Sequence, residues 1–190
     1  MLLRYVLCLG LVLLPLIANA QQFKKSSLKV HLFPLTVLEI DGGLRGGFEY
    51  RSSKYFSIKA DYNHLLDALN KSPDVKNLSG YSLRLEPRFF MDEDYPDLYG
   101  AVQLQYKTKA WQLNSADSIK PLQHIFSMNI VAGNQKYLTK RLGLDYYLGA
   151  GFGPRYNTVA YGEGFFRRKE GRSLRLSLQL GASVFMKIGN

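Results

Sequence analysis

Cysteine is nearly absent from this sequence, because only Cys8 is found among the 190 residues. Cys8 lies in an N-terminal segment that we expect to be removed, so the mature protein would carry no thiol. Disulfide bonds, thiolate metal sites and cysteine nucleophiles are then excluded together. Histidine is also scarce. His31, His64 and His124 match no metal-ligand spacing, so we predict no metal site and no cofactor.

A long hydrophobic run is absent after residue 20, which excludes a transmembrane helix. Residues 1–20 read MLLRYVLCLGLVLLPLIANA, with one cation at Arg4, an apolar run over residues 5–17, and small residues at Ala18 and Ala20. This pattern is typical of a cleaved secretory signal peptide. We therefore predict an exported chain that forms a single domain over residues 21–190.

Acidic residues are in the minority, since 15 Asp and Glu stand against 25 Lys and Arg, for a net charge of +10. A basic chain favours anionic partners. An exported protein seldom meets nucleic acid. We therefore expect phosphorylated lipid as the anionic partner, and no nucleic acid.

The body of the chain alternates apolar and polar residues with period two, as a β-strand with two unlike faces does. The clearest case is residues 174–186, where Leu174, Leu176, Leu178 and Leu180 alternate with polar or small residues. Similar alternation predicts seven more strands, over residues 28–33, 44–50, 56–63, 81–89, 98–107, 125–132 and 142–152. The sequence thus predicts an all-β fold of eight strands, with one or two helical turns within residues 134–141.

The predicted links alternate in length, and the longer ones cover residues 34–43, 64–80, 110–121 and 154–172. Eight strands, with short turns at the end of both termini and long loops opposite, are typical of an antiparallel up-and-down transmembrane β-barrel. No Lys, Arg, Asp or Glu falls on the apolar face of the six clearest strands. The rival interpretation is a soluble lipocalin-like barrel with an apolar interior.

Side-chain volume favours the membrane interpretation. Eight strands enclose just enough room for side chains. The polar face holds small residues such as Gly47, Ser57 and Ser82, whereas the apolar face is mostly Leu, Phe and Tyr. We therefore expect the polar face to line the lumen. Charges of both signs would pair there: Arg45, Glu49, Lys59, Asp61, Arg84, Glu86, Arg88, Lys107, Asp145 and Arg175.

Aromatic residues cluster near the predicted strand ends, where interfacial girdles are expected. On the loop side we expect Phe33, Tyr62, Tyr81, Tyr106, Trp111 and Phe152. On the turn side we expect Tyr55, Phe56, Phe89, Phe90, Tyr99 and Phe185.

Several segments carry a family resemblance: LKVHLFP at residues 28–34, the strand from Gly80 to residues 87–90 (PRFF), and KRLGLD at 140–145 with GAGFG at 149–153. Together they resemble a family of small outer-membrane barrels with a domain of unknown function, found in some Gram-negative bacteria. The resemblance implies an eight-stranded barrel of the OmpA/OmpX size class in the outer membrane, with periplasmic termini. It implies no catalytic activity.

The sequence shows no convincing catalytic constellation. His124 and Ser127 are three residues apart on a predicted strand and therefore face opposite sides. The acidic residues Asp92, Glu93 and Asp94 are typical of a solvated turn, and the glycines of residues 149–153 lack the helix that a phosphate loop needs. We predict a non-enzymatic protein.

The sharpest surface feature is FFRRKEGR at residues 165–172, in the last predicted long loop. Its Arg167, Arg168, Lys169 and Arg172 are predicted to contact lipopolysaccharide phosphates. The expected function is a structural or interaction role in the outer membrane, including that of an accessory subunit of a larger assembly. The alternatives are an enzyme acting on envelope lipid, a narrow pore, or a soluble lipocalin-like ligand-binding barrel.

Overall fold

The computed structural model describes residues 27–34, 41–70, 75–91, 97–113, 119–161 and 166–188. The predicted signal peptide, residues 1–20, lies outside the described residues, and so does Cys8. The acidic residues Asp92, Glu93 and Asp94 lie outside them too. Among the described residues, no helix is long and apolar enough to cross a membrane.

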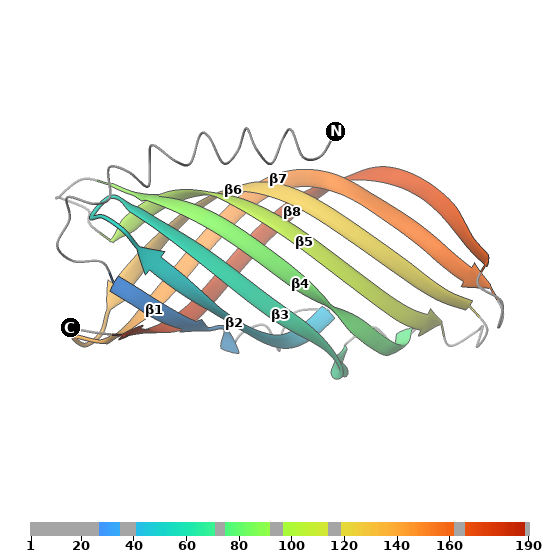
Figure 1. The fold of residues 1–190 in the computed structure, drawn as a ribbon, viewed down its shortest axis with the longest axis horizontal. Coiled ribbons are helices and arrows are strands. Elements are labelled where there is room, and N and C mark those ends of the chain that lie inside the picture. Colours follow the sequence, from blue (N-terminus) through green and yellow to red (C-terminus); the bar gives the residue numbers. More distant parts are fainter. Residues whose placement is uncertain are drawn as a thin grey trace.

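The described chain forms eight strands in one closed antiparallel barrel, in which each strand pairs with its neighbours in sequence (Figure 1). The strands are β1 (Ser27–Leu32), β2 (Asp41–Arg51), β3 (Phe56–Asn70), β4 (Val75–Phe90), β5 (Leu98–Leu113), β6 (Ile119–Tyr137), β7 (Leu142–Tyr161) and β8 (Phe166–Ile188). This confirms the prediction of an all-β, eight-stranded antiparallel barrel.

Closure of the barrel depends on a short contact between its first and last strands. β1 pairs with β8 from Leu28 opposite Ile188 to Leu32 opposite Val184. The C-terminal end of β8 and the start of β1 therefore lie at the same end as the links at residues 52–55 and 138–141, which we call the turn end. The strands β6, β7 and β8 extend towards the opposite end, the loop end (Figure 1).

The strands are longer than the alternation predicts, and the predicted link lengths are wrong. β6, β7 and β8 have 19, 20 and 23 residues, whereas about 9–11 residues cross a membrane as a tilted strand. Backbone pairing continues past the alternating region, so most of residues 154–172 belongs to β7 and β8 rather than to a loop. The predicted helical turns within residues 134–141 are also wrong, because β6 continues to Tyr137.

Alternation decides which side chains point inward. On β8 the even-numbered leucines point outward, and Leu178 and Leu180 are each 88% exposed. The odd-numbered Ser183 and Phe185 are buried inside. The same division holds on β4, where Leu83 faces out and its neighbours on either side are buried.

Four of the aromatic residues expected in the interfacial girdles instead lie inside the barrel: Phe33, Phe90, Tyr99 and Phe185. The reason is their register, because Phe90, Tyr99 and Phe185 occupy inward positions of their strands, and Phe33 directly follows β1 on the side of the buried His31. Phe185, for example, follows Ser183 on the inner face of β8. Other expected girdle residues, such as Tyr62, Tyr81, Phe89 and Phe152, face outward.

Candidate functional site: the charged lumen

The turn end of the lumen is filled by a charge network, which we define by its charged members Lys29, His31, Glu49, Lys59, Glu86, Arg88 and Asp145. Their side chains are almost wholly inaccessible to solvent. At its centre, Arg88 of β4 donates from Nε to Glu86 (2.6 Å), from Nη1 to Glu49 (3.1 Å) and from Nη2 to Asp145 (2.9 Å). One guanidinium thus satisfies three carboxylates, which the planar fork of an arginine allows.

Glu49 of β2 is the common partner of the two charged side chains from β1. Lys29 Nζ lies 3.2 Å from Glu49 Oε1, and His31 Nε2 lies 3.1 Å from Glu49 Oε2. Gln135 of β6 donates to the same carboxylate and accepts from Lys29. His31 Nδ1 is 3.1 Å from Ser183 Oγ of β8.

Asp145 of β7 is a second carboxylate that accepts hydrogen bonds from several strands. It accepts from Lys59 Nζ of β3 at 2.9 Å and from the Tyr99 hydroxyl of β5 at 2.8 Å, in addition to Arg88. All eight strands therefore contribute a side chain to this one set of contacts. Removing one member would leave its buried partners with less counter-charge, which is unfavourable.

Aromatic rings pack around the network and exclude water from it. Phe33, Phe90, Tyr99, Tyr147 and others form the buried apolar cluster of the barrel. Lys59 Nζ lies 4.5 Å from the centroid of the Phe33 ring, and Arg88 Cζ lies 4.2 Å from that of Tyr99. Such cation–π contacts favour cations within an aromatic surround.

Glycines make room for these inward rings. Tyr99 of β5 lies opposite Gly133 of β6, and a Cβ at Gly133 would collide with the Tyr99 ring. Tyr147 of β7 has the same relation to Gly181 of β8. Gly133 and Gly181, together with Gly143 beside the Phe185 ring, are therefore each matched to a particular ring.

The structure places the ten expected lumen charges in two groups. Five of them, Glu49, Lys59, Glu86, Arg88 and Asp145, belong to the charge network. Asp61 lies beside it, with Oδ2 3.9 Å from Lys59 Nζ. The remaining four are cations nearer the loop end, where Arg45 and Arg84 are buried, Lys107 is half-buried and Arg175 is exposed.

Sequence reasoning missed two charged members of the network, Lys29 and His31. Both lie on β1, whose alternation covers only six residues. The available signal was that Leu28, Val30 and Leu32 occupy the other face. The network's amide partners Gln103 and Gln135 were also missed, because an uncharged side chain on a polar face carries no obvious signal.

The four cations expected to contact lipopolysaccharide, Arg167, Arg168, Lys169 and Arg172, lie on β8 and not in a loop. Their backbone pairs with β7, for example Arg168 opposite Val159. Their side chains lie outside what the structure describes. The backbone places this segment at the loop end of the barrel.

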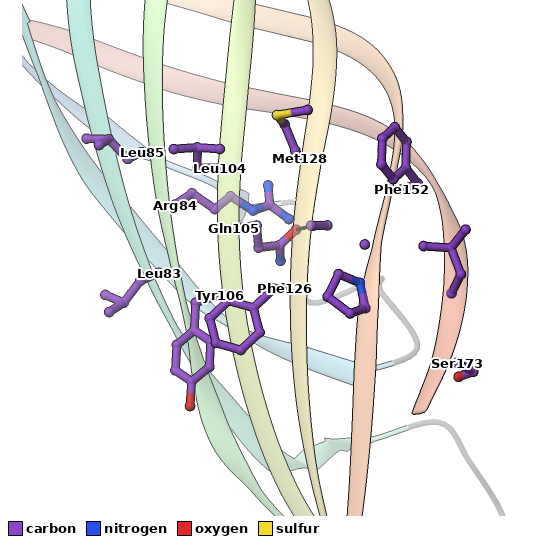
Figure 2. A pocket seen from close by; sticks show the side chains of 14 residues that line it. Leu83, Arg84, Leu85, Leu104, Gln105, Tyr106, Phe126, Met128, Phe152 and Ser173 are labelled. Atoms are coloured by element: carbon purple, nitrogen blue, oxygen red, sulfur yellow. Dashed lines mark hydrogen bonds between the residues drawn. The ribbon is translucent and has the colours of Figure 1, made fainter. Parts of the chain in front are cut away.

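The outer wall carries an apolar groove of about 940 Å³ that crosses β4 to β8. Figure 2 shows the rings of Tyr106 and Phe126 side by side at this groove, and their centroids are 4.7 Å apart. Leu83, Leu104 and Phe152 are among its other apolar residues. The groove presents a surface to which hydrocarbon is well suited.

The remaining polar candidates are placed apart. His124 bonds to the Tyr106 hydroxyl at 2.9 Å, whereas the Ser127 hydroxyl lies 3.5 Å from Gln105 Oε1 on the inner side. The prediction that His124 and Ser127 face opposite sides is thus confirmed. No group of three or more His, Cys, Asp or Glu suited to a metal ion occurs among the described residues.

Comparisons with protein-family models, curated proteins and solved structures gave no match. The resemblance to small outer-membrane barrels therefore stays a prediction. The described chain is a closed eight-stranded barrel with a charged, densely bonded interior and an outer wall that exposes many large apolar side chains.

Proposed function

We propose that this protein is a non-enzymatic β-barrel of the Gram-negative outer membrane, with a structural or interaction role and periplasmic termini. The observation that carries the proposal is the inverted distribution of polarity. Arg88 and Lys29 are wholly buried in the lumen, while Leu178 and Leu180 on the outer wall are 88% exposed. Exposing so many large apolar side chains to water is unfavourable, whereas a barrel that spans lipid has an apolar outer wall of this kind.

The closed topology supports the same proposal. A barrel that spans lipid must leave no strand edge unpaired, because hydrocarbon offers no hydrogen bonds. Here each strand is paired on both sides within one closed sheet. A lipocalin-like barrel would need an apolar interior for its ligand, and the buried charge network occupies that space.

A structural role is favoured over a pore by the filling of the lumen. The charge network and its aromatic rings leave their members inaccessible to solvent at the turn end. The cationic segment of β8, with Arg167 and Arg168, supports contact with lipopolysaccharide phosphates at the loop end. Apolar contact along the outer groove is the proposed basis for association with other membrane proteins.

The experiment is fractionation combined with gel mobility. The protein should sediment with outer membranes and resist extraction by carbonate or urea. A folded sample should migrate differently from a boiled one on a denaturing gel. Release of the protein by carbonate, with no difference in mobility, would contradict the proposal.

The interaction role needs a separate test. Crosslinking followed by purification in mild detergent should recover defined membrane proteins with the wild-type barrel. Replacing Phe126 by Ala in the outer groove should reduce that recovery, while the folded mobility on gels is kept. Unchanged recovery would contradict the groove as the contact.

A further inference from the structure

The loop half of the lumen differs in charge from the turn half. A cavity of about 380 Å³ lies there, and its lining residues include three cations, Arg84 of β4, Lys107 of β5 and Arg175 of β8. Among the described residues that line it, none is acidic. The charge network below it, by contrast, pairs cations with Glu49, Glu86 and Asp145. The described lining of the cavity is therefore cationic, whereas the charge network at the turn end contains both cations and carboxylates.

Arg84 is the residue that points to a ligand. It is more than nine-tenths buried, with 9% of its surface exposed. Its Nη1 donates to the Tyr147 hydroxyl at 2.9 Å, but its Nε has no hydrogen-bond partner. A buried guanidinium donor without an acceptor is costly, because buried polar groups are nearly always bonded.

Neighbouring side chains do not supply the missing acceptor. Asp61 of β3 lies opposite Arg84 in the sheet register, but its Oδ2 pairs with Lys59, and its Oδ1, although also without a partner, makes no hydrogen bond to Arg84. Gln179 of β8 donates to Gln105 at 2.9 Å, and its own Oε1 is also without a partner. The Nε of Arg84 therefore has no acceptor among the described side chains, although two further cations line the same cavity.

We propose that this cavity binds a phosphate-type oxyanion, carried by a phosphorylated small molecule or by a lipid. Guanidinium groups match the oxygens of phosphate with paired hydrogen bonds. Arg84 would donate through its Nε, and Arg175 and Lys107 would complete the charge balance. The Ser127 hydroxyl, which also lines the cavity, can donate to the same oxygens.

The size of the cavity fits more than a bare phosphate. Sites for small molecules occupy about 300–1,000 Å³, and this cavity lies at the lower end of that range. The apolar residue Ile125 also lines it. A phosphorylated compound with a small apolar part would therefore use both kinds of surface.

The test is isothermal titration calorimetry on the whole protein in detergent, at constant ionic strength set with chloride. One arm uses inorganic phosphate and the other a short-chain phosphatidic acid. Wild-type protein should bind at least one of them saturably. Arg84→Gln should weaken that binding about tenfold to a hundredfold, as loss of a charged hydrogen bond does.

The matched control is Arg141→Gln, which removes one cation from an exposed turn at the opposite end of the barrel. It should bind as the wild type does. If Arg84→Gln does not show the folded mobility on gels, Arg175→Gln at the exposed rim of the cavity replaces it, with the same expectation.

Binding of inorganic phosphate that is lost in the cavity variant supports a soluble phosphorylated ligand. Binding of phosphatidic acid alone, lost in the same variant, supports a lipid headgroup. Absence of binding in both arms would overturn the proposal. Equal weakening in Arg141→Gln would overturn it as well, because it would indicate unspecific attraction to a basic protein.

Discussion

At the scale of single residues, Arg88 holds the interior together. Its guanidinium is the common partner of Glu86, Glu49 and Asp145, which come from three different strands. Coulomb attraction between such groups is strong because solvent does not reach them. Their mutual pairing is also what makes their burial tolerable.

Replacing Arg88 by Leu should therefore destabilise the barrel by about 3–5 kcal/mol, since three buried carboxylates lose a shared counter-charge. Urea unfolding of the protein in lipid vesicles measures the change. Arg141→Leu, the same substitution in an exposed turn, should change the free energy of unfolding by less than about 0.5 kcal/mol. Equal effects of the two substitutions would contradict the assigned role of Arg88.

Two glycines offer a sharp comparison at the same scale. A Cβ at Gly133 meets the buried ring of Tyr99, whereas a Cβ at Gly100 meets nothing within 4 Å. Gly133→Ala should cost about 1–3 kcal/mol through overpacking, while Gly100→Ala should stay within about 0.5 kcal/mol. The same unfolding assay applies. A neutral Gly133→Ala would mean that Tyr99 does not occupy the position described.

At the scale of elements, β8 shows the clearest difference in exposure and polarity between its two faces. Leu174, Leu176, Leu178 and Leu180 are the most exposed leucines in the wall. β8 is also much longer than a membrane crossing requires. Under the proposed function, its leucine-rich part would contact hydrocarbon, and its segment near Arg167 would lie among anionic headgroups.

Leu178→Arg tests this division. If the wall contacts lipid, the substitution should cost about 2–4 kcal/mol in vesicles. The control is Leu138→Arg, which places the same side chain at an exposed leucine in the link between β6 and β7. It should be nearly neutral. Two nearly neutral substitutions would favour a barrel surrounded by water, since both leucines are exposed in the structure.

The alternation of the sequence predicted the strands and their two faces because period two is a local property. Leu83 and Arg84, for example, were assigned to opposite faces correctly. Strand length was not predictable in this way, because β7 and β8 continue as paired backbone after the alternation weakens. The positions of Phe33 and Phe185 were misjudged when their place near a strand end was weighed above their register.

At the scale of the whole molecule, the candidate site depends on contacts between distant strands. Lys59 and Asp145 are 86 residues apart in sequence and meet only because the barrel closes. Their burial side by side follows from curvature that a single strand does not encode. The sequence therefore predicted that charges line the lumen, but not which pairs form or that Lys29 and His31 join them.

The charge network that fills the turn half of the lumen predicts a protein that does not conduct ions. In planar bilayers, the wild-type barrel should give no conductance above a protein-free control. As a control for insertion, protein from the same preparation that is reconstituted into lipid vesicles should show the folded gel mobility. Steady stepwise conductance would contradict the network as a closed barrier and would favour the narrow-pore alternative.

The central claim is that the apolar face of the barrel contacts lipid, and cysteine scanning of residues 174–186 tests it most directly. The predicted mature chain has no thiol, so each introduced cysteine can be labelled alone. A quencher dissolved in the lipid phase should reach labels at even positions such as 176, 178 and 180, and should spare the odd ones. Even positions that react with an aqueous thiol reagent and show no lipid quenching would contradict the account.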